Sequence, residues 1–116
     1  MERNELLEVT TELALFTITY CEILEKDRKY IIARQLLKSG TSIGANSREA
    51  QGAESKADFI HKLKIAYKEA VETEYWLTLC EKSNSYQNPP QELKNKLNSS
   101  LKLLGKIISS SKKIIE

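Results

Sequence analysis

The segment from Arg34 to Ala50 constrains the fold most, because it places two glycines, Gly40 and Gly44, inside a helical pattern. Each interior glycine costs a helix about 1 kcal/mol relative to alanine. A helix that carries two of them one turn apart is therefore expected to need a close approach by a neighbour. At about 100° per residue, one stripe of this helix is apolar or small. It comprises Ile32, Ala33, Leu36, Leu37, Gly40, Ile43, Gly44 and Ser47.

Two helices are predicted in the first half of the chain. The first begins at Asn4, which is expected to be its N-cap, and ends near Leu24. A charged turn follows, in which Asp27 is expected to cap the glycine-containing helix. Gly52 is a suitable residue to end that helix, because glycine is common just past a helix C-terminus.

The second half contains clear signals for two further helix starts. Ser55 and Asp58 have the spacing of a capping-box variant, and the apolar pattern continues to about Lys82. Asn88 is expected to cap the last helix, with the two following prolines in its first turn, where no N–H bond is lost. The sequence thus predicts four helices of comparable length.

Composition agrees with an all-helical chain. Only four glycines and two prolines interrupt the 116 residues, and no segment alternates in the manner of a β-strand. Four long helices with short connections favour an all-α, antiparallel, up-down-up-down four-helix bundle. We expect residues 1–116 to form a single domain.

The chain has no segment suited to a membrane or to secretion. Its apolar runs are far shorter than the roughly 20 residues that span a bilayer, and its N-terminus lacks the features of a signal peptide. We therefore expect a cytoplasmic protein. Cys21 and Cys80 occupy apolar helix positions, where isolated cysteines usually act as small buried side chains rather than as a disulfide.

Residues suited to catalysis or metal binding are scarce. Asp58 and His61 are spaced like half of a di-iron motif, but a second histidine is missing, so neither a metal nor another cofactor is expected. No nucleophilic triad or phosphate-binding loop is present. Glu74 falls within the predicted core stripe of the third helix, and it should reach solvent or pair with a cation such as Arg34 or Arg48. We expect no enzymatic activity.

Basic residues concentrate in two parts of the chain. Residues 27–53 and 84–116 have an excess of Lys and Arg, whereas residues 1–26 are acidic. An anionic partner should meet one of the basic segments. The candidate phosphate contacts are Arg34, Lys38, Arg48, Lys102, Lys106 and Lys113. The three lysines share one predicted outer face of the last helix.

The third helix is apolar on two sides, which indicates two packing partners. Its main stripe comprises Phe59, Ile60, Leu63, Ala66, Tyr67, Ala70, Val71, Leu77 and Cys80. A second strip comprises Ile65, Trp76 and Leu79, interleaved with Glu69 and Glu72. We expect the second strip to contact the basic glycine-containing helix of another copy, head to tail, and contacts of that kind can close into a ring.

Four segments of the chain carry a specific resemblance. They read QLLKSGTSIGAN at residues 35–46, REA at 48–50, ESKADFIHKL at 54–63 and KEAVETEYWL at 68–77. With these segments the chain resembles the bacterial four helix bundle protein family, first found encoded within intervening sequences of 23S rRNA genes. Lys38 stands where this family often has arginine, and Ser47 where it often has a β-branched aliphatic residue.

The resemblance implies a left-handed antiparallel bundle that assembles as a ring-like homopentamer, with no established biochemical activity. The accessory variability determinants of diversity-generating retroelements are similar in fold, and those pentamers bind nucleic acid and a reverse transcriptase. Our leading hypothesis is an oligomeric accessory protein that contacts RNA through its basic helix faces. The alternative is a protein-interaction scaffold that binds a protein partner and no nucleic acid.

Overall fold

The structure, a computed structural model, describes the backbone of residues 4–115 and the side chains of residues 4–113. All regular structure in this range is α-helical. The elements are α1 (Glu5–Lys26), α2 (Tyr30–Gln51), α3 (Lys56–Lys82) and α4 (Gln91–Ile115). The prediction of four helices and no strands is confirmed for these residues, while the two ends of the predicted domain lie outside them.

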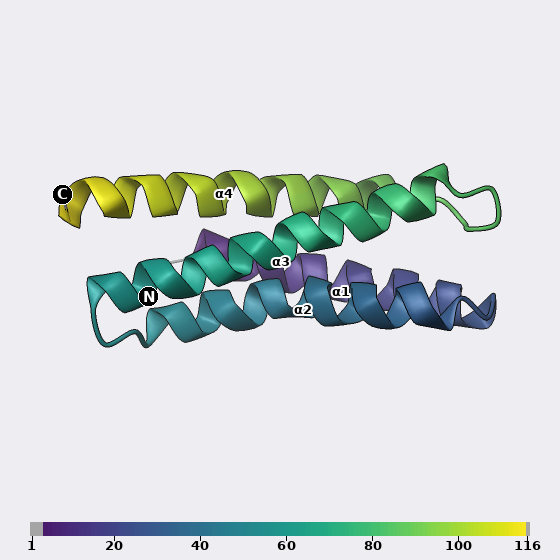
Figure 1. Cartoon of the computed structure of the whole chain (residues 1–116), viewed down its shortest axis with the longest axis horizontal. Helices are drawn as coiled ribbons and strands as arrows, with labels where there is room; N and C mark the ends of the chain where they lie inside the picture. Colours follow the sequence, from purple (N-terminus) through teal and green to yellow (C-terminus); the bar gives the residue numbers. More distant parts are fainter. Residues whose placement is uncertain (1–3, 116) are drawn as a thin grey trace.

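The four helices form an elongated bundle whose longest dimension is 48 Å (Figure 1). The α1–α2 and α3–α4 connections lie at one end of the bundle, and the α2–α3 connection lies at the other. Each helix packs side by side with two others: α1 and α3 both lie next to α2 and α4, but α1 and α3 are not neighbours along their lengths. Likewise α2 and α4 are not neighbours, so these two basic helices occupy opposite corners.

The core runs along the centre of the bundle and receives leucines from every helix. Leu13, Leu36, Leu63 and Leu93 are fully buried, one from each of the four helices. Burying a leucine contributes roughly 1.5–3 kcal/mol, so these layers provide much of the force that holds the helices together. The helix periodicity of the sequence is therefore satisfied by a single shared core.

The glycine side of α2 faces α1, where the two glycines have different surroundings. A β-carbon on Gly40 would lie 2.7 Å from Cγ2 and 2.9 Å from Oγ1 of Thr17, so no side chain fits there without movement. A β-carbon on Gly44 would lie 3.5 Å from the Thr10 carbonyl oxygen, which is ordinary contact. The predicted close approach is thus confirmed at Gly40, against a side chain rather than the backbone.

The opposite edge of α2 contacts α3 through a buried polar pair. The Thr73 hydroxyl lies 2.9 Å from the Ser39 hydroxyl, and both side chains are fully buried. Thr73 also donates toward the Glu69 carbonyl of its own helix at 2.8 Å, and Ser47 donates to the Ile43 carbonyl in the same way. These bonds satisfy hydroxyl groups that would otherwise be costly to bury.

Two of the predicted helix caps are confirmed. Asn4 accepts a hydrogen bond from the Leu7 amide at 3.1 Å, and Ser55 accepts one from the Asp58 amide at 3.0 Å. The Asp58 carboxylate accepts from the Glu54 amide and so completes a reciprocal arrangement at the start of α3.

The other two predicted starts differ from the structure. Asp27 does not cap α2; it follows the last turn of α1, and its carboxylate accepts a hydrogen bond from the Gln87 side chain at 2.9 Å. Arg28, with a positive φ of 63°, redirects the chain at this turn, so α2 begins two residues later than Asp27 would allow. Both prolines precede α4 instead of occupying its first turn, because Pro90 disfavours helical geometry at the residue before it.

The predicted core stripe of α3 is partly wrong. Tyr67 and Val71 are exposed, whereas Thr73 is fully buried. Glu74 reaches solvent, one of the two outcomes expected for it, and lies beside Lys94 of α4 rather than beside the arginines of α2. The side of α3 that faces the core is set by contacts with both α2 and α4. Because this side includes the polar residue Thr73, hydropathy alone did not identify it.

Candidate nucleic-acid interface

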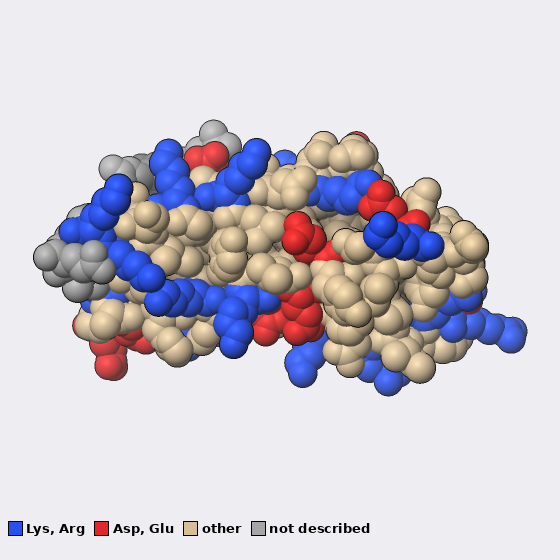
Figure 2. All heavy atoms as spheres, turned by 45° about the horizontal axis from the view of Figure 1, so that its top comes forward, with Lys and Arg blue, Asp and Glu red and all other residues tan. Residues whose placement is uncertain are grey.

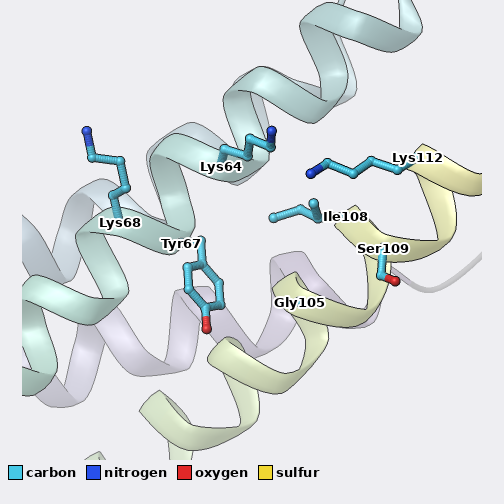
Figure 3. Close-up of a pocket in the computed structure, with 7 residues that line it drawn as sticks. All are labelled: Lys64, Tyr67, Lys68, Gly105, Ile108, Ser109 and Lys112. Carbon is cyan, nitrogen blue, oxygen red and sulfur yellow. The ribbon is translucent and has the colours of Figure 1, made fainter. Parts of the chain in front are cut away.

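An open pocket of about 490 Å³ lies between α3 and α4 (Figure 3). We call it the α3–α4 pocket; its lining residues are Lys64, Tyr67, Lys68, Gly105, Ile108, Ser109 and Lys112. It contains three lysines and no carboxylate. The pocket is therefore suited to an anionic ligand that also has an apolar part.

Helical spacing brings these residues together. On α3, Lys64 and Lys68 are one turn apart, with Tyr67 between them on the side toward α4. On α4, Gly105 and Lys112 are two turns apart and Ile108 lies between them. Residues three or four positions apart share a helix face, so each helix contributes one continuous edge of the pocket.

The positive charges of the pocket are concentrated near its mouth. Figure 3 shows the ammonium ends of Lys64 and Lys112 directed toward each other, whereas Lys68 points away from them. A side-chain hydrogen bond with Lys112 lowers the pKa of Lys64, and repulsion between the two like charges lowers it further. An anion placed between these two groups would relieve their repulsion.

The surrounding surface is also basic. Figure 2, in which α4 comes forward, shows Lys and Arg side chains on both sides of a band of uncharged surface over the left half of this face. Acidic side chains are more prominent toward the middle of the molecule in the same view. The basic region thus extends beyond the pocket itself.

The predicted lysines of α4 occupy the surface near this region. Lys102, Lys106 and Lys113 are all exposed and follow one another at helical spacing. Lys102 lines a second groove, together with Glu5, Glu8 and Glu12 of α1. These carboxylates reduce its attraction for a phosphate, which leaves Lys106 and Lys113 as the stronger members of the predicted strip.

The predicted basic residues of α2 lie elsewhere. Arg34, Lys38 and Arg48 are exposed on α2, which is not packed beside α4, so α1 or α3 separates them from the lysines of α4. Arg48 donates a hydrogen bond to the Thr11 hydroxyl at 3.3 Å, across the α1–α2 seam. The sequence placed both groups on outer faces correctly but could not show that the two faces are separated.

The predicted subunit-interface strip of α3 is only partly exposed. Trp76 is half-buried and packs against the core, and its indole N–H donates to the Glu72 carboxylate at 3.1 Å. Ile65 is also half-buried, whereas Leu79 is 37% exposed. Of the three apolar side chains, Leu79 thus presents the most open surface to a partner.

Glu69 occupies a polar position at the edge of this strip. Burial raises the pKa of the Glu69 carboxyl and the Glu72 charge adds to the rise, while Lys38 and Lys68 act in the opposite direction. The sequence led us to expect cations from another subunit for Glu69. In the structure, lysines of the same chain already provide part of that compensation.

Large apolar side chains of α1 and α2 are exposed at positions for which the sequence predicted no interface. Leu15 is 60% exposed and Ile18 is 40% exposed on α1, and Leu37 is 37% exposed on α2. The hydrogen bond between Arg48 and Thr11 joins the outer faces of α1 and α2 near Thr11, one turn before Leu15. The available signal was that Leu15 and Ile18 do not share the helix face of Leu6 and Leu13.

The described residues offer little for metal binding or covalent catalysis. No group of three or more His, Cys, Asp or Glu side chains among residues 4–113 could hold a metal ion, and His61 is exposed. Cys21 and Cys80 are free thiols, and burial raises the pKa of both. Within the described part of the chain, no helix is both long and apolar enough to cross a membrane.

Comparisons with known proteins identify one matching family and one similar solved structure. The family described as 23S rRNA-intervening sequence protein matches residues 2–109. A crystal structure from Bacteroides thetaiotaomicron, described as a protein with unknown function from the S23 ribosomal protein family, is 40% identical and superimposes with a TM-score of 0.81. The alignment covers 89% of this chain and 97% of that one. No curated protein matches the chain.

Proposed function

The chain belongs to the 23S rRNA-intervening sequence protein family, and we propose that it is a non-enzymatic accessory protein that binds RNA through its α3–α4 side. The observation that supports this most is the clustering of Lys64, Lys68 and Lys112 around a pocket that also presents an aromatic ring. Lysines supply the charge for phosphates, and an aromatic side chain supplies a surface on which a base can stack. Lys106 and Lys113 are exposed on the outward face of α4, next to this side.

The test is the salt dependence of binding to a single-stranded RNA, measured by fluorescence anisotropy. Replacing Lys102, Lys106 and Lys113 together with glutamine should weaken binding and lower the slope of log K against log salt by about 1.4, the value for two lost phosphate contacts on a single strand, because carboxylates of α1 already offset the charge of Lys102. Helicity should not change, because all three side chains are exposed.

A matched control removes the same amount of charge from the opposite corner of the bundle. Arg34, Lys38 and Arg48 replaced with glutamine should leave RNA affinity nearly unchanged, because α2 lies away from α4. The reverse result would move the RNA site to α2. A parent protein with no salt-sensitive RNA binding would refute the proposal.

We further propose that the working form is a cyclic homo-oligomer of antiparallel, up-down-up-down bundles in the cytoplasm; the number five comes from the family resemblance alone. The alternating ends of the three connections support the antiparallel arrangement. The exposed apolar side chains on α1, α2 and α3 support self-association. Two unpaired thiols are in keeping with a reducing compartment.

The alternative function is a protein-interaction scaffold without a nucleic-acid role. It is favoured by the exposed side chains of Leu15, Ile18 and Leu37, which are apolar rather than basic. A partner held by such a surface should remain bound as salt is raised, whereas RNA held by lysines should be released. A pull-down with and without nuclease separates the two.

A further inference from the structure

Gly105 has no steric reason to be a glycine. It lies in the interior of α4, where glycine has a lower helix propensity than alanine. A β-carbon at this position would meet only Cε2 of Tyr67, at 3.9 Å, which is ordinary contact. This differs from Gly40, where Thr17 excludes a β-carbon. Because position 105 has no side chain, the α3–α4 pocket stays open beside the Tyr67 ring.

The pocket separates charge from apolar surface. Figure 3 shows Lys64 and Lys112 approaching each other above Ile108, and the Tyr67 ring on the side toward Gly105. Tyr67 is 38% exposed, so part of its ring is available to a ligand. A molecule that matches this arrangement carries a compact anion at one end and a flat apolar group at the other.

The volume of the pocket limits the size of the ligand. At about 490 Å³ the pocket is within the range of small-molecule sites, and it is open to solvent at one side. A nucleotide has both required parts, because its phosphate is the anion and its base is the flat group. Since the pocket is open, the neighbouring nucleotides of a strand can continue along the basic surface of α4.

We propose that the α3–α4 pocket holds one nucleotide of a bound RNA strand, with its phosphate between Lys64 and Lys112 and its base against Tyr67 beside Gly105. This rests on the proposed function, to which it adds a defined subsite and a preference for an unstacked base. The pocket has no pattern of side chains that would distinguish one base from another, so the subsite should accept purines and pyrimidines alike.

The first experiment uses adenosine monophosphate, ribose 5-phosphate and adenosine as probes, with binding followed by NMR of the isotope-labelled protein. Adenosine monophosphate should bind at least about tenfold more tightly than ribose 5-phosphate, because only the former can stack on Tyr67. It should also bind more tightly than adenosine, which lacks the phosphate. Equal affinity for adenosine monophosphate and ribose 5-phosphate would overturn the base-stacking part and with it the proposal.

Variants at Gly105 test the location. Gly105→Leu should fill the pocket and reduce affinity for adenosine monophosphate at least about tenfold, while Gly105→Ala should change it less than about twofold. Tyr67→Leu provides a second test that keeps apolar bulk at an exposed position and removes only the aromatic face.

The lysines test the phosphate end of the subsite. Lys64→Gln with Lys112→Gln should reduce the affinity for adenosine monophosphate, whereas Lys106→Gln with Lys113→Gln should not change it. Full binding by Gly105→Leu and Tyr67→Leu would overturn the proposal.

The same variants distinguish this inference from the proposed function. RNA binding that is lost on removing the three outer lysines of α4 but unchanged by Gly105→Leu would overturn the subsite and leave the RNA role standing. Adenosine monophosphate binding that is lost in Gly105→Leu, in a protein that retains no RNA, would support the subsite as a nucleotide site and refute the RNA role.

Discussion

The two glycines of α2 illustrate how differently one residue type can act within a single helix. Gly40 is required by Thr17, whose β-branched side chain is fully buried and donates its hydroxyl to the Leu13 carbonyl at 2.7 Å, so it cannot easily move aside. Gly44 has room for a methyl group. The energetic consequence of adding that group should therefore differ in sign between the two positions.

We predict that Gly40→Ala lowers the free energy of unfolding by about 1–3 kcal/mol, as overpacking usually does. Gly44→Ala should leave stability unchanged or raise it by up to about 1 kcal/mol through helix propensity. Urea unfolding followed by circular dichroism measures both. Adding Thr17→Ala to Gly40→Ala should recover part of the loss, since the atoms that clash are removed; additive effects would show that Thr17 is not the obstacle.

Buried titratable groups make the bundle sensitive to alkaline conditions. Burial, with smaller contributions from Glu25 and Cys80, raises the pKa of the Cys21 thiol from 9.0 to about 12, and burial also raises the pKa of the Tyr20 hydroxyl. Between pH 9 and pH 12 the unfolded chain loses the Cys21 proton while the folded chain keeps it. The unfolded state then binds fewer protons, so stability falls as pH rises through this window.

We therefore expect the free energy of unfolding to be constant near neutral pH and to decline above about pH 9, as measured by urea titrations at several pH values. Cys21→Ala should be less stable at pH 7 but should show a shallower decline. Parallel curves for parent and variant would mean that Cys21 does not contribute. In the native state, neither Cys21 nor Cys80 should react readily with a thiol reagent at pH 8.

At the level of elements, the stability of α3 depends on its N-cap, Ser55, which precedes the first helical residue. The Ser55 hydroxyl accepts from the Asp58 amide, and the Asp58 carboxylate returns a bond to the Glu54 amide. Ser55→Ala should destabilise the protein by about 1 kcal/mol, the usual cost of losing an N-cap, as measured by thermal or urea unfolding. Ser110→Ala is a suitable control, because Ser110 is exposed within α4, and it should not destabilise. Equal effects would show that the cap is unimportant.

The positions of the helices around the core decide which charges can act together. α2 and α4 are both basic, yet they occupy opposite corners and present their charges to opposite sides. α3 is nearly balanced in sequence, but Lys64 and Lys68 lie on its edge toward α4, where Lys112 adds to them. This positive surface is thus built partly from α3, a helix that its composition would not have singled out.

At the scale of the whole molecule, two different surfaces are suited to a head-to-tail contact. The edge of α3 with Leu79 carries Glu69 and Glu72, whereas the α1–α2 seam with Leu37 carries Arg34 and Arg48. The charges of these surfaces are complementary, and a contact between unlike surfaces closes into a ring when its rotation allows. This complementarity supports the cyclic assembly proposed above.

We predict that Leu79→Glu and Leu37→Glu each yield smaller species than the parent by light scattering, with unchanged helicity. Both side chains are partly exposed, so charge should be tolerated in the isolated chain, whereas Trp76→Ala would also remove core contacts. Val71→Glu is the control, because Val71 is exposed on another face of α3 and should leave the assembly intact. A parent protein that is monomeric at micromolar concentration would refute the ring.

The sequence by itself determined the number of helices, their approximate ends and most of the core, because apolar periodicity and capping residues are local signals. It also located Gly40 as a point of close approach. It failed where a polar residue faces the core, as Thr73 does, since hydropathy alone cannot show that Ser39 would satisfy its hydroxyl. Tyr67 was assigned to the core although it is exposed, because hydropathy alone does not show which side of α3 faces the other helices.

Only the tertiary structure decided how the helix faces combine. The α3–α4 pocket joins Lys64 and Tyr67 to Gly105 and Lys112, residues roughly forty positions apart, and no local pattern links them. Nor could the sequence show that the basic faces of α2 and α4 are held apart. Helical periodicity defines the faces of each helix separately, whereas the neighbour that each face meets depends on the simultaneous packing of all four helices around one core.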